Sequence, residues 1–197
     1  MILYKIFFRL QVIGRENIPL EGGFILASNH ASFLDPPALA VASPRVLSFM
    51  ALEGLFRIPL FGRFIASLNA IPVKSKSSDL KSLRQAISEL SSGGVLNIFP
   101  EGIRSPNGEL GKPLRGIGLL AVKADVPIVP AFIKGSNKAL PVHSKLIRPK
   151  KIKVYFGRPF LPKEMSTQSS NKDLYQAIAA RTMDEIKRLK EKSQNEG

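Results

Sequence analysis

A single α/β domain, in which helices cover a largely parallel, mixed sheet, is the fold that this 197-residue sequence predicts. Short apolar runs of strand length alternate with helix-like segments along the chain. The strand-like runs are continuously apolar, which is typical of strands that have both faces covered by helices. The length fits one domain, and a hydrophobic content of 44% is enough to form a core.

The elements follow one another in a regular order. We expect strands at 23–29, 95–100, 127–133 and 151–157, and helices at 35–43, 79–93 and 116–126. In the helix at 79–93, Leu80, Leu83, Ile87 and Leu90 recur at helical spacing, so we expect this stripe to face the core. The pair Gly93-Gly94 then ends the helix, because glycine adopts the left-handed conformation of a helix C-cap readily.

The C-terminal part predicts a polar linker and a long terminal helix. Residues 163–172 are mostly polar, and a basic helix is expected at 173–192. Its apolar positions fall on one side, at Leu174, Ile178, Ile186 and Leu189. Residues 11–197 are therefore predicted to form the domain, and residues 1–10 are a candidate interfacial anchor.

Two apolar segments are candidates for membrane contact. Residues 1–10 are too short to span a bilayer, which takes roughly 20 residues. They could form an interfacial helix with Lys5 and Arg9 on one face and Phe7, Phe8 and Leu10 nearer the lipid, or a helix or strand packed on the core. The run 55–73 is interrupted by charged residues, proline and glycine, so it predicts a membrane-facing or substrate-lining hairpin.

Composition limits the chemistry and the partners. The chain has no cysteine, which excludes disulfides, thiolate nucleophiles and cysteine-ligated zinc, and the presence of only two histidines argues against a histidine-based metal site. A formal charge of +14 favours anionic partners such as nucleic acid, anionic lipid or an acidic carrier protein. The absence of tryptophan and the position of the phenylalanines in apolar runs argue against nucleic acid.

The sequence Asn29-His30, followed by Asp35, is the first candidate for chemistry. A strand that ends at Asn29 places His30 at the carboxyl edge of the sheet, where open α/β sheets carry their sites. If the chain folds back, Asp35 can accept a hydrogen bond from one imidazole nitrogen and leave the other as a free base. Alternatively, Asp35 is only the N-cap of a helix that begins at Pro36, and His30 is a polar turn residue.

The second candidate is the segment that follows the strand at 95–100. That strand delivers Glu101 and Arg104 to the same edge, and Gly102 allows a sharp turn beside them. A planar guanidinium suits a phosphate monoester because it donates two parallel hydrogen bonds. Lys112 and Arg115 add positive charge nearby. The alternative is that Glu101 and Arg104 form a surface ion pair in a loop.

Taken together, these motifs resemble the glycerolipid acyltransferase family, typified by 1-acylglycerol-3-phosphate acyltransferases. The first family motif is matched by Asn29, His30, Ser32 and Asp35, the third by Phe99 to Ser105 with Ile103 in place of Thr, and the fourth by Val126 to Pro130. The resemblance covers roughly residues 11 to 162 in the family's order. It departs at Lys74, where the family usually carries Arg, and at Leu52 and Glu53, where basic residues are frequent.

The resemblance implies a glycerol-3-phosphate acyltransferase-like fold and an O-acyltransferase that makes phosphatidic acid in phospholipid biosynthesis. His30 is then the general base on a free hydroxyl of a lysophospholipid, and Asp35 orients it. The acceptor's head group is expected to contact Lys74, Glu101, Gly102, Arg104 and Ser105. Ser32 is interpreted as a turn residue, and His143 as a loop residue.

The implied partners are a lysophospholipid acceptor, an acyl-CoA or acyl carrier protein donor, and an anionic membrane surface, with no nucleic acid, no metal and no cofactor beyond the acyl donor. We expect peripheral or monotopic association with the cytoplasmic face of the membrane. The alternatives are a sibling acyltransferase that uses glycerol-3-phosphate or a lyso-aminolipid, and a non-catalytic basic membrane-binding domain.

Overall fold

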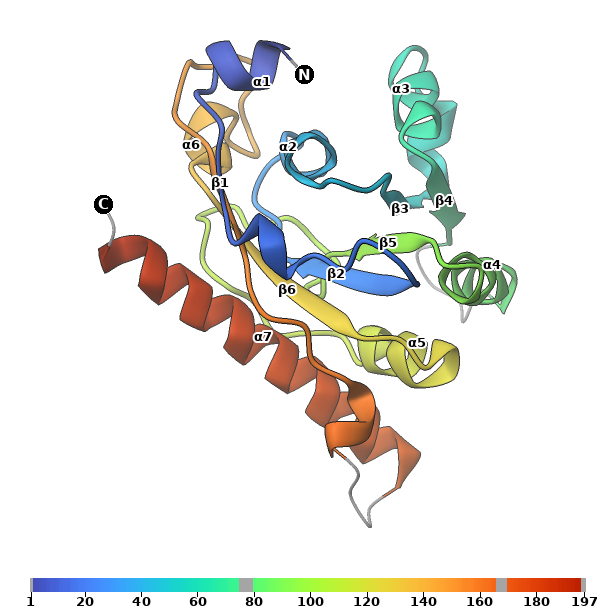
Figure 1. The fold of residues 1–197 in the computed structure, drawn as a ribbon. Coiled ribbons are helices and arrows are strands. Elements are labelled where there is room, and N and C mark those ends of the chain that lie inside the picture. Colours follow the sequence, from blue (N-terminus) through green and yellow to red (C-terminus); the bar gives the residue numbers. More distant parts are fainter. Residues whose placement is uncertain (1, 75–79, 166–169, 196–197) are drawn as a thin grey trace.

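The computed structural model describes the chain except residues 1, 75–79, 166–169 and 196–197 (Figure 1). Its centre is one seven-stranded sheet in the order β1-β7-β6-β2-β5-β3-β4. The strands are β1 (Gln11–Ile13), β2 (Phe24–Ser28), β3 (Ser48–Leu52), β4 (Ala70–Val73), β5 (Val95–Ile98), β6 (Ile128–Lys134) and β7 (Lys153–Phe156). Neighbours pair in parallel except β6 and β7, so the prediction of a mixed, largely parallel sheet is confirmed.

Helices cover both faces of the sheet. They are α1 (Ile2–Ile6), α2 (Asp35–Ala42), α3 (Phe61–Ser67), α4 (Leu80–Ser91), α5 (Gly116–Ala124), α6 (Ser136–Ala139) and α7 (Asn171–Asn195), with 3-10 turns η1 (Arg15–Asn17), η2 (Glu53–Arg57) and η3 (Pro162–Met165). In Figure 1, α1, α2, α3 and α6 lie above the sheet, and α5 and α7 lie below it. Within the described ranges, no helix is both long and apolar enough to cross a bilayer.

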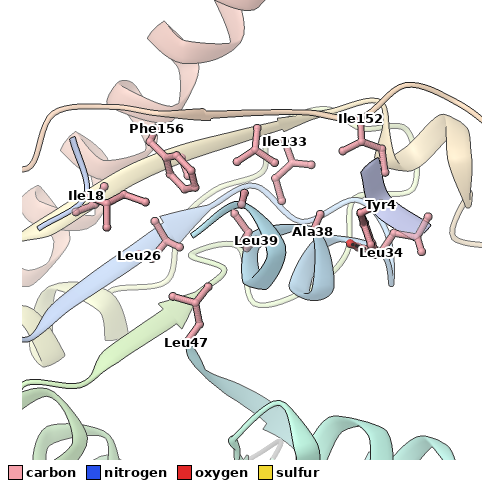
Figure 2. Packing of buried hydrophobic residues seen from close by; sticks show 14 of the residues in the cluster. Tyr4, Ile18, Leu26, Leu34, Ala38, Leu39, Leu47, Ile133, Ile152 and Phe156 are labelled. Carbon is pink, nitrogen blue, oxygen red and sulfur yellow. Dashed lines mark hydrogen bonds between the residues drawn. The ribbon is translucent and has the colours of Figure 1, made fainter. Parts of the chain in front are cut away.

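Each face of the sheet has its own hydrophobic cluster. Figure 2 shows the cluster on the α2 face, where Leu39 of α2 packs with Leu26 of β2 and Phe156 of β7. The other cluster joins the sheet to α4, α5 and α7, with Ile178 and Ile186 of α7 fully buried. The central strand β2 is buried at every residue, as its continuous apolar sequence predicts.

The predicted end of α4 is confirmed, but Leu80, one residue of its apolar stripe, does not face the core. Gly93 has a φ of 89°, and the N–H groups of Gly93 and Gly94 donate to the carbonyls of Leu90 and Glu89. This is the hydrogen-bond pattern of a glycine C-cap. Leu90 is buried, whereas Leu80 is 60% exposed because it is the first residue of the helix and lies beyond the edge of the sheet-facing cluster.

The N-terminal segment differs from the interfacial helix that its sequence suggested. α1 ends at Ile6 and Arg9 has a φ of 45°, so Lys5 and Arg9 do not share a continuous helical face. Tyr4 and Phe8 are buried in the α2-side cluster, which contradicts the placement of Phe8 toward lipid. Leu10 also packs against that cluster. The alternative, a helix packed on the core, is the correct one, although Ile6 and Phe7 remain exposed.

The predicted hairpin at 55–73 is also wrong. β3 and β4 are parallel, and the connection between them contains η2 and α3. Parallel neighbours cannot be joined by a tight hairpin, and the helix supplies the return path. Ile58, Leu60 and Phe64 of this connection are exposed.

Candidate active site

The site lies at the carboxyl edge of the parallel strands, where the chain leaves β2 and β5. These two strands are direct neighbours, so the segments that follow them meet. Asn29 fixes the first segment, because its amide group donates to the Ile133 carbonyl at 3.1 Å and accepts from the Ile133 N–H at 2.7 Å. This reciprocal pair continues the sheet by one residue and sets the position of His30.

His30 and Asp35 form the pair that the sequence predicted. His30 Nδ1 lies 2.9 Å from Asp35 Oδ2, and the carboxylate is fully buried. The same oxygen accepts the N–H groups of Ala31 and Ser32, each at 2.7 Å. An oxygen with three donors around it is an acceptor, which assigns the proton to Nδ1 and leaves Nε2 as the basic nitrogen.

Asp35 does not act as the cap of its own helix. It is the first residue of α2, and no side chain caps that terminus by a hydrogen bond. Its carboxylate instead binds the backbone of Ala31 and Ser32, upstream of the helix. The N-cap alternative is therefore wrong. Ser32 is a turn residue as expected: its hydroxyl accepts the Leu34 N–H and donates to the Leu140 carbonyl.

Hydrogen bonds join the first motif to the third. Glu101 Oε1 accepts the His30 N–H at 3.2 Å, and the His30 carbonyl accepts the Ser105 N–H at 2.8 Å. Glu101 Oε2 accepts the Gly111 N–H at 2.8 Å. The backbone of His30 is thus held on both sides by the loop that follows β5. Burial raises the pKa of Glu101, and these backbone hydrogen bonds oppose the shift.

Two aromatic rings, which the sequence analysis did not single out, support the site. Phe99 stacks on the His30 imidazole, with ring centroids 3.9 Å apart and an interplanar angle of 16°. Phe33 lies under the Arg104 guanidinium, 3.5 Å from its central carbon. Phe99 is the first residue of the third motif and Phe33 lies between His30 and Asp35, but the sequence pattern assigns neither ring a role in the site. Only the fold shows the stacking.

Arg104 has an unused donor. Its Nη1 is buried and has no hydrogen-bond partner among the described residues. Burial lowers the pKa of Arg104, while the charge of Asp35 opposes the shift. A desolvated guanidinium with a free donor is poised to bind an anion, since leaving it unpaired is costly.

A cavity of about 260 Å³ opens beside this guanidinium. Its lining comprises Glu101, Ile103, Arg104, Ser105, Pro106, Asn107, Glu109, Leu110, Gly111 and Lys112. Gly102 has a φ of 71°, a conformation that residues with a side chain rarely adopt, so glycine suits the turn of the loop beside the cavity. Glu109 would oppose an anionic ligand, but its carboxylate pairs with Lys190 of α7 at 2.6 Å.

Lys74 does not line this cavity. It follows β4, is exposed, and lines a second hollow of about 320 Å³ with Leu52, Glu53, Gly54, Arg57 and Val73. Hydrogen bonds and the first cavity join His30, Asp35, Glu101, Arg104 and Ser105, and Gly102 lies in the same loop, whereas Lys74 lines the second hollow. His143 is exposed in the segment between α6 and β7. Among the described residues, no group of three histidine, aspartate or glutamate side chains is arranged to hold a metal ion.

Comparisons with known proteins relate this chain to one family. The model of the Acyltransferase family matches residues 9–134. A 1-acyl-sn-glycerol-3-phosphate acyltransferase of Bacillus subtilis is 30% identical over 152 residues, which cover 76% of this chain and 73% of the relative. A chloroplastic enzyme of the same name from Arabidopsis thaliana is 31% identical over 142 residues, 71% of this chain but only 40% of the relative.

The fold also matches a solved structure. The crystal structure of the 1-acyl-sn-glycerophosphate acyltransferase PlsC from Thermotoga maritima superposes with a TM-score of 0.72 and 30% identity, covering 90% of this chain and 72% of that chain. The site residues at the ends of β2 and β5 lie within the matched family region.

Proposed function

Because the chain belongs to the Acyltransferase family, we propose that it transfers a fatty acyl group to the free hydroxyl of 1-acylglycerol-3-phosphate, forming phosphatidic acid. The acyl donor is a thioester of coenzyme A or of acyl carrier protein. No cofactor beyond this co-substrate takes part. The observation that carries the proposal is the His30–Asp35 pair, held by its backbone against a loop whose buried guanidinium has a free donor.

The reaction follows from the orientation of the imidazole. Asp35 holds the Nδ1 proton, so Nε2 takes the proton of the acceptor hydroxyl as its oxygen attacks the thioester carbonyl. Asp35 stabilises the imidazolium that results. When the tetrahedral intermediate collapses, the carbon–sulfur bond breaks and the imidazolium returns the proton to the thiolate. The acyl group passes directly to the acceptor oxygen, without a covalent acyl-enzyme.

The acceptor's phosphate is assigned to the cavity beside Arg104. Nη1 of Arg104 donates to a phosphate oxygen, and Lys112 supplies further positive charge from the cavity wall. Gly102 and Ser105 shape the loop around the phosphate. Glu101 has both oxygens on backbone N–H groups, which favours a positioning role for it over direct contact with the head group.

A panel of acceptors tests the proposal. Purified protein is given a long-chain acyl-CoA and, in turn, lysophosphatidic acid, glycerol-3-phosphate, a lyso-aminolipid and monoacylglycerol, and the acylated product is quantified. Rapid acylation of lysophosphatidic acid alone is the expected result. Preference for glycerol-3-phosphate or a lyso-aminolipid would reassign the acceptor, and no transfer with any acceptor or donor would leave only a lipid-binding role.

Lys74 requires a separate test because it lies outside the phosphate cavity. If Lys74 contacts the phosphate, Lys74→Arg preserves or improves the KM for lysophosphatidic acid, because the guanidinium binds phosphate bidentately. If it contacts the acyl donor through the second hollow, the same variant changes the KM of the donor alone. Arg84, which is exposed on α4, gives the matched control Arg84→Lys.

A further inference from the structure

The wall of the cavity beside Arg104 contains an acidic side chain that the proposed phosphate site does not use. Of the described residues that line this cavity, Glu101 and Glu109 are the acidic ones. Glu101 has its carboxylate oxygens on the backbone N–H groups of His30 and Gly111. The side chain of Glu109 is instead 69% exposed. A negative charge in this position repels an anionic head group.

The cation that pairs with Glu109 comes from the C-terminal helix. Lys190 of α7 has its Nζ 2.6 Å from Glu109 Oε2, and the lysine side chain is only 21% exposed. The two residues are 81 positions apart in the sequence, so the fold and not the local sequence makes this contact. It joins α7 to the loop that follows β5 and lines the cavity.

The end of α7 is fixed to the sheet close to this contact. Figure 1 shows α7, in red, running beneath the sheet. Lys134, the last residue of β6, donates from its Nζ to the Ser193 carbonyl at 2.6 Å, and the Ser193 hydroxyl donates to the Lys190 carbonyl at 2.6 Å. Leu189 of α7 and Leu110 of the cavity loop pack against the same hydrophobic cluster. Lys190 is therefore presented to the cavity loop from a rigid support.

The loop that carries Glu109 is folded by hydrogen bonds of its own. Asn107 Oδ1 accepts the Ser105 hydroxyl at 2.9 Å and the Glu109 N–H at 3.0 Å. The Ser105 N–H donates to the His30 carbonyl at 2.8 Å. These bonds shape the loop without a contribution from α7. What Lys190 adds is a charge beside the carboxylate.

The electrostatic balance of the cavity depends on this charge. Arg104 and Lys112 are the cations among the described residues of the lining, and a free Glu109 carboxylate would cancel part of their attraction for a phosphate. Lys190 offsets that carboxylate. An ion pair with an exposed partner contributes little to the stability of a fold, whereas an uncompensated carboxylate in the wall of a binding site acts directly on a charged ligand.

We propose that Lys190 is a positioning residue for the acceptor: it holds the Glu109 carboxylate in an ion pair and so keeps the cavity selective for an anionic head group. The proposal rests on the proposed function, which assigns a phosphate to the cavity beside Arg104. Lys190 acts through Glu109 and does not itself contact the phosphate. The family model matches residues 9–134, so this contact couples the acceptor site to a helix outside the matched region.

Three variants test the charge argument: Lys190→Met, Glu109→Gln and the double variant. Lys190→Met leaves Glu109 unpaired and is expected to raise the KM for lysophosphatidic acid roughly three- to tenfold, with little change in kcat or in the KM of the acyl donor. Glu109→Gln removes the opposing charge and is expected to lower the acceptor KM roughly twofold. The double variant is expected to return the KM to about the wild-type value, because the effects of two interacting residues are not additive.

Two further variants serve as controls. Lys187→Met changes the charge of α7 equally at an exposed position three residues before Lys190, and it is expected to keep the wild-type KM. Lys190→Arg preserves the ion pair and is expected to stay within about twofold of the wild-type KM. Thermal melting verifies that each variant is folded, and the loss of an exposed ion pair is expected to change the Tm little.

Two outcomes would overturn the proposal. If Glu109→Gln raises the acceptor KM as much as Lys190→Met does, and the double variant is no better than either, the contact holds the shape of the loop and not its charge. If Lys190→Met leaves the acceptor KM unchanged, Glu109 does not act on the acceptor.

Failure of the proposed function has a separate signature. If the wild type acylates no phosphate-bearing acceptor, the proposed function fails, but isothermal titration calorimetry with glycerol-3-phosphate still measures the affinity of the cavity for a soluble phosphate monoester. A weaker affinity in Lys190→Met than in the wild type and Lys187→Met supports the role of Lys190 without any turnover. Equal affinities in all three proteins overturn it.

Discussion

Replacement of Asp35 by asparagine removes one charge from a site whose geometry determines how the amide must be placed. Asp35 Oδ2 accepts three hydrogen bonds, from His30 Nδ1 and from the N–H groups of Ala31 and Ser32. The amide NH₂ cannot occupy that position because it would meet three donors. The asparagine oxygen must therefore take the place of Oδ2, which keeps the imidazole in its position and tautomer.

The expected loss then comes from charge. In Asp35→Asn, the imidazolium formed during transfer has no carboxylate beside it. Two unit charges about 4 Å apart at an effective dielectric constant of about 20 interact by about 4 kcal/mol, and partial solvation of His30 reduces this to about 3–4 kcal/mol. This corresponds to a fall in kcat of roughly 10²- to 10³-fold, since each 1.4 kcal/mol is tenfold.

The variant is also expected to be less stable. Asp35 Oδ1 is buried without a partner among the described residues, so the NH₂ group that replaces it leaves two donors unsatisfied. A buried unsatisfied donor costs about 1–3 kcal/mol. Thermal melting should therefore show a lower Tm, and the activity assay must be run well below it.

Release of coenzyme A is a direct assay for this variant. The chain contains no cysteine, so a thiol-reactive chromophore reports only the thiol of the product. Asp184→Asn, at an exposed aspartate on α7, is the control and should behave as the wild type does. A folded Asp35→Asn protein with kcat within about threefold of the wild-type value would refute the role given to the carboxylate.

Three further predictions follow from the contacts around His30. Arg104→Ala should raise the KM for lysophosphatidic acid by roughly 30- to 100-fold, with little change for the acyl donor, because a charge-assisted pair contributes about 2–3 kcal/mol; an unchanged acceptor KM would remove the phosphate from this site. Phe99→Leu should lower kcat several-fold because the His30 imidazole loses the ring on which it stacks. An unchanged Tm would show that this loss is not caused by a less stable fold. Glu101→Gln should destabilise the protein through the loop bonds to His30 and Gly111. Since the folded pKa of Glu101 is raised, the folded state binds the proton more tightly, and the wild type loses stability as pH rises through the range just above 4.5. The Tm difference between wild type and Glu101→Gln should shrink across that range; a difference that grows with pH would contradict the burial argument.

The fold class and the His30–Asp35 pair could be predicted from the sequence because both depend on residues that are close together along the chain. The continuously apolar strands and the Gly93-Gly94 cap have short-range signals, and the buried β2 and the end of α4 follow them. His30 and Asp35 are five residues apart, so one turn of chain brings them together. The errors occur where distant packing decides: Phe8 is buried by strands from the far end of the chain, and the run 55–73 forms no hairpin because β4 pairs in parallel with β3.

The stacking of the two aromatic rings on His30 and Arg104 could not be predicted for a related reason. Phe99 is a strand-terminal apolar residue in the sequence, and only the pairing of β2 with β5 places its ring on His30. Phe33 lies between His30 and Asp35, but its contact with Arg104 depends on a loop about 70 residues later. Stacking across elements has no sequence period, in contrast to helices and strands.

The hydrogen bonds that bracket His30 tie the His30–Asp35 pair to two neighbouring strands, β2 and β5, and to the loop that follows β5. Glu101 and Ser105 reach His30 only because β2 and β5 are neighbours, and β3, α3 and β4 lie outside that pair at one edge of the sheet. Residues 48–73 are not isolated from this unit, because Phe61 of α3 packs edge-to-face on Phe33, the ring that lies under the Arg104 guanidinium. A change of length or sequence in that connection would therefore reach Arg104 through Phe33 before it reached the His30–Asp35 pair.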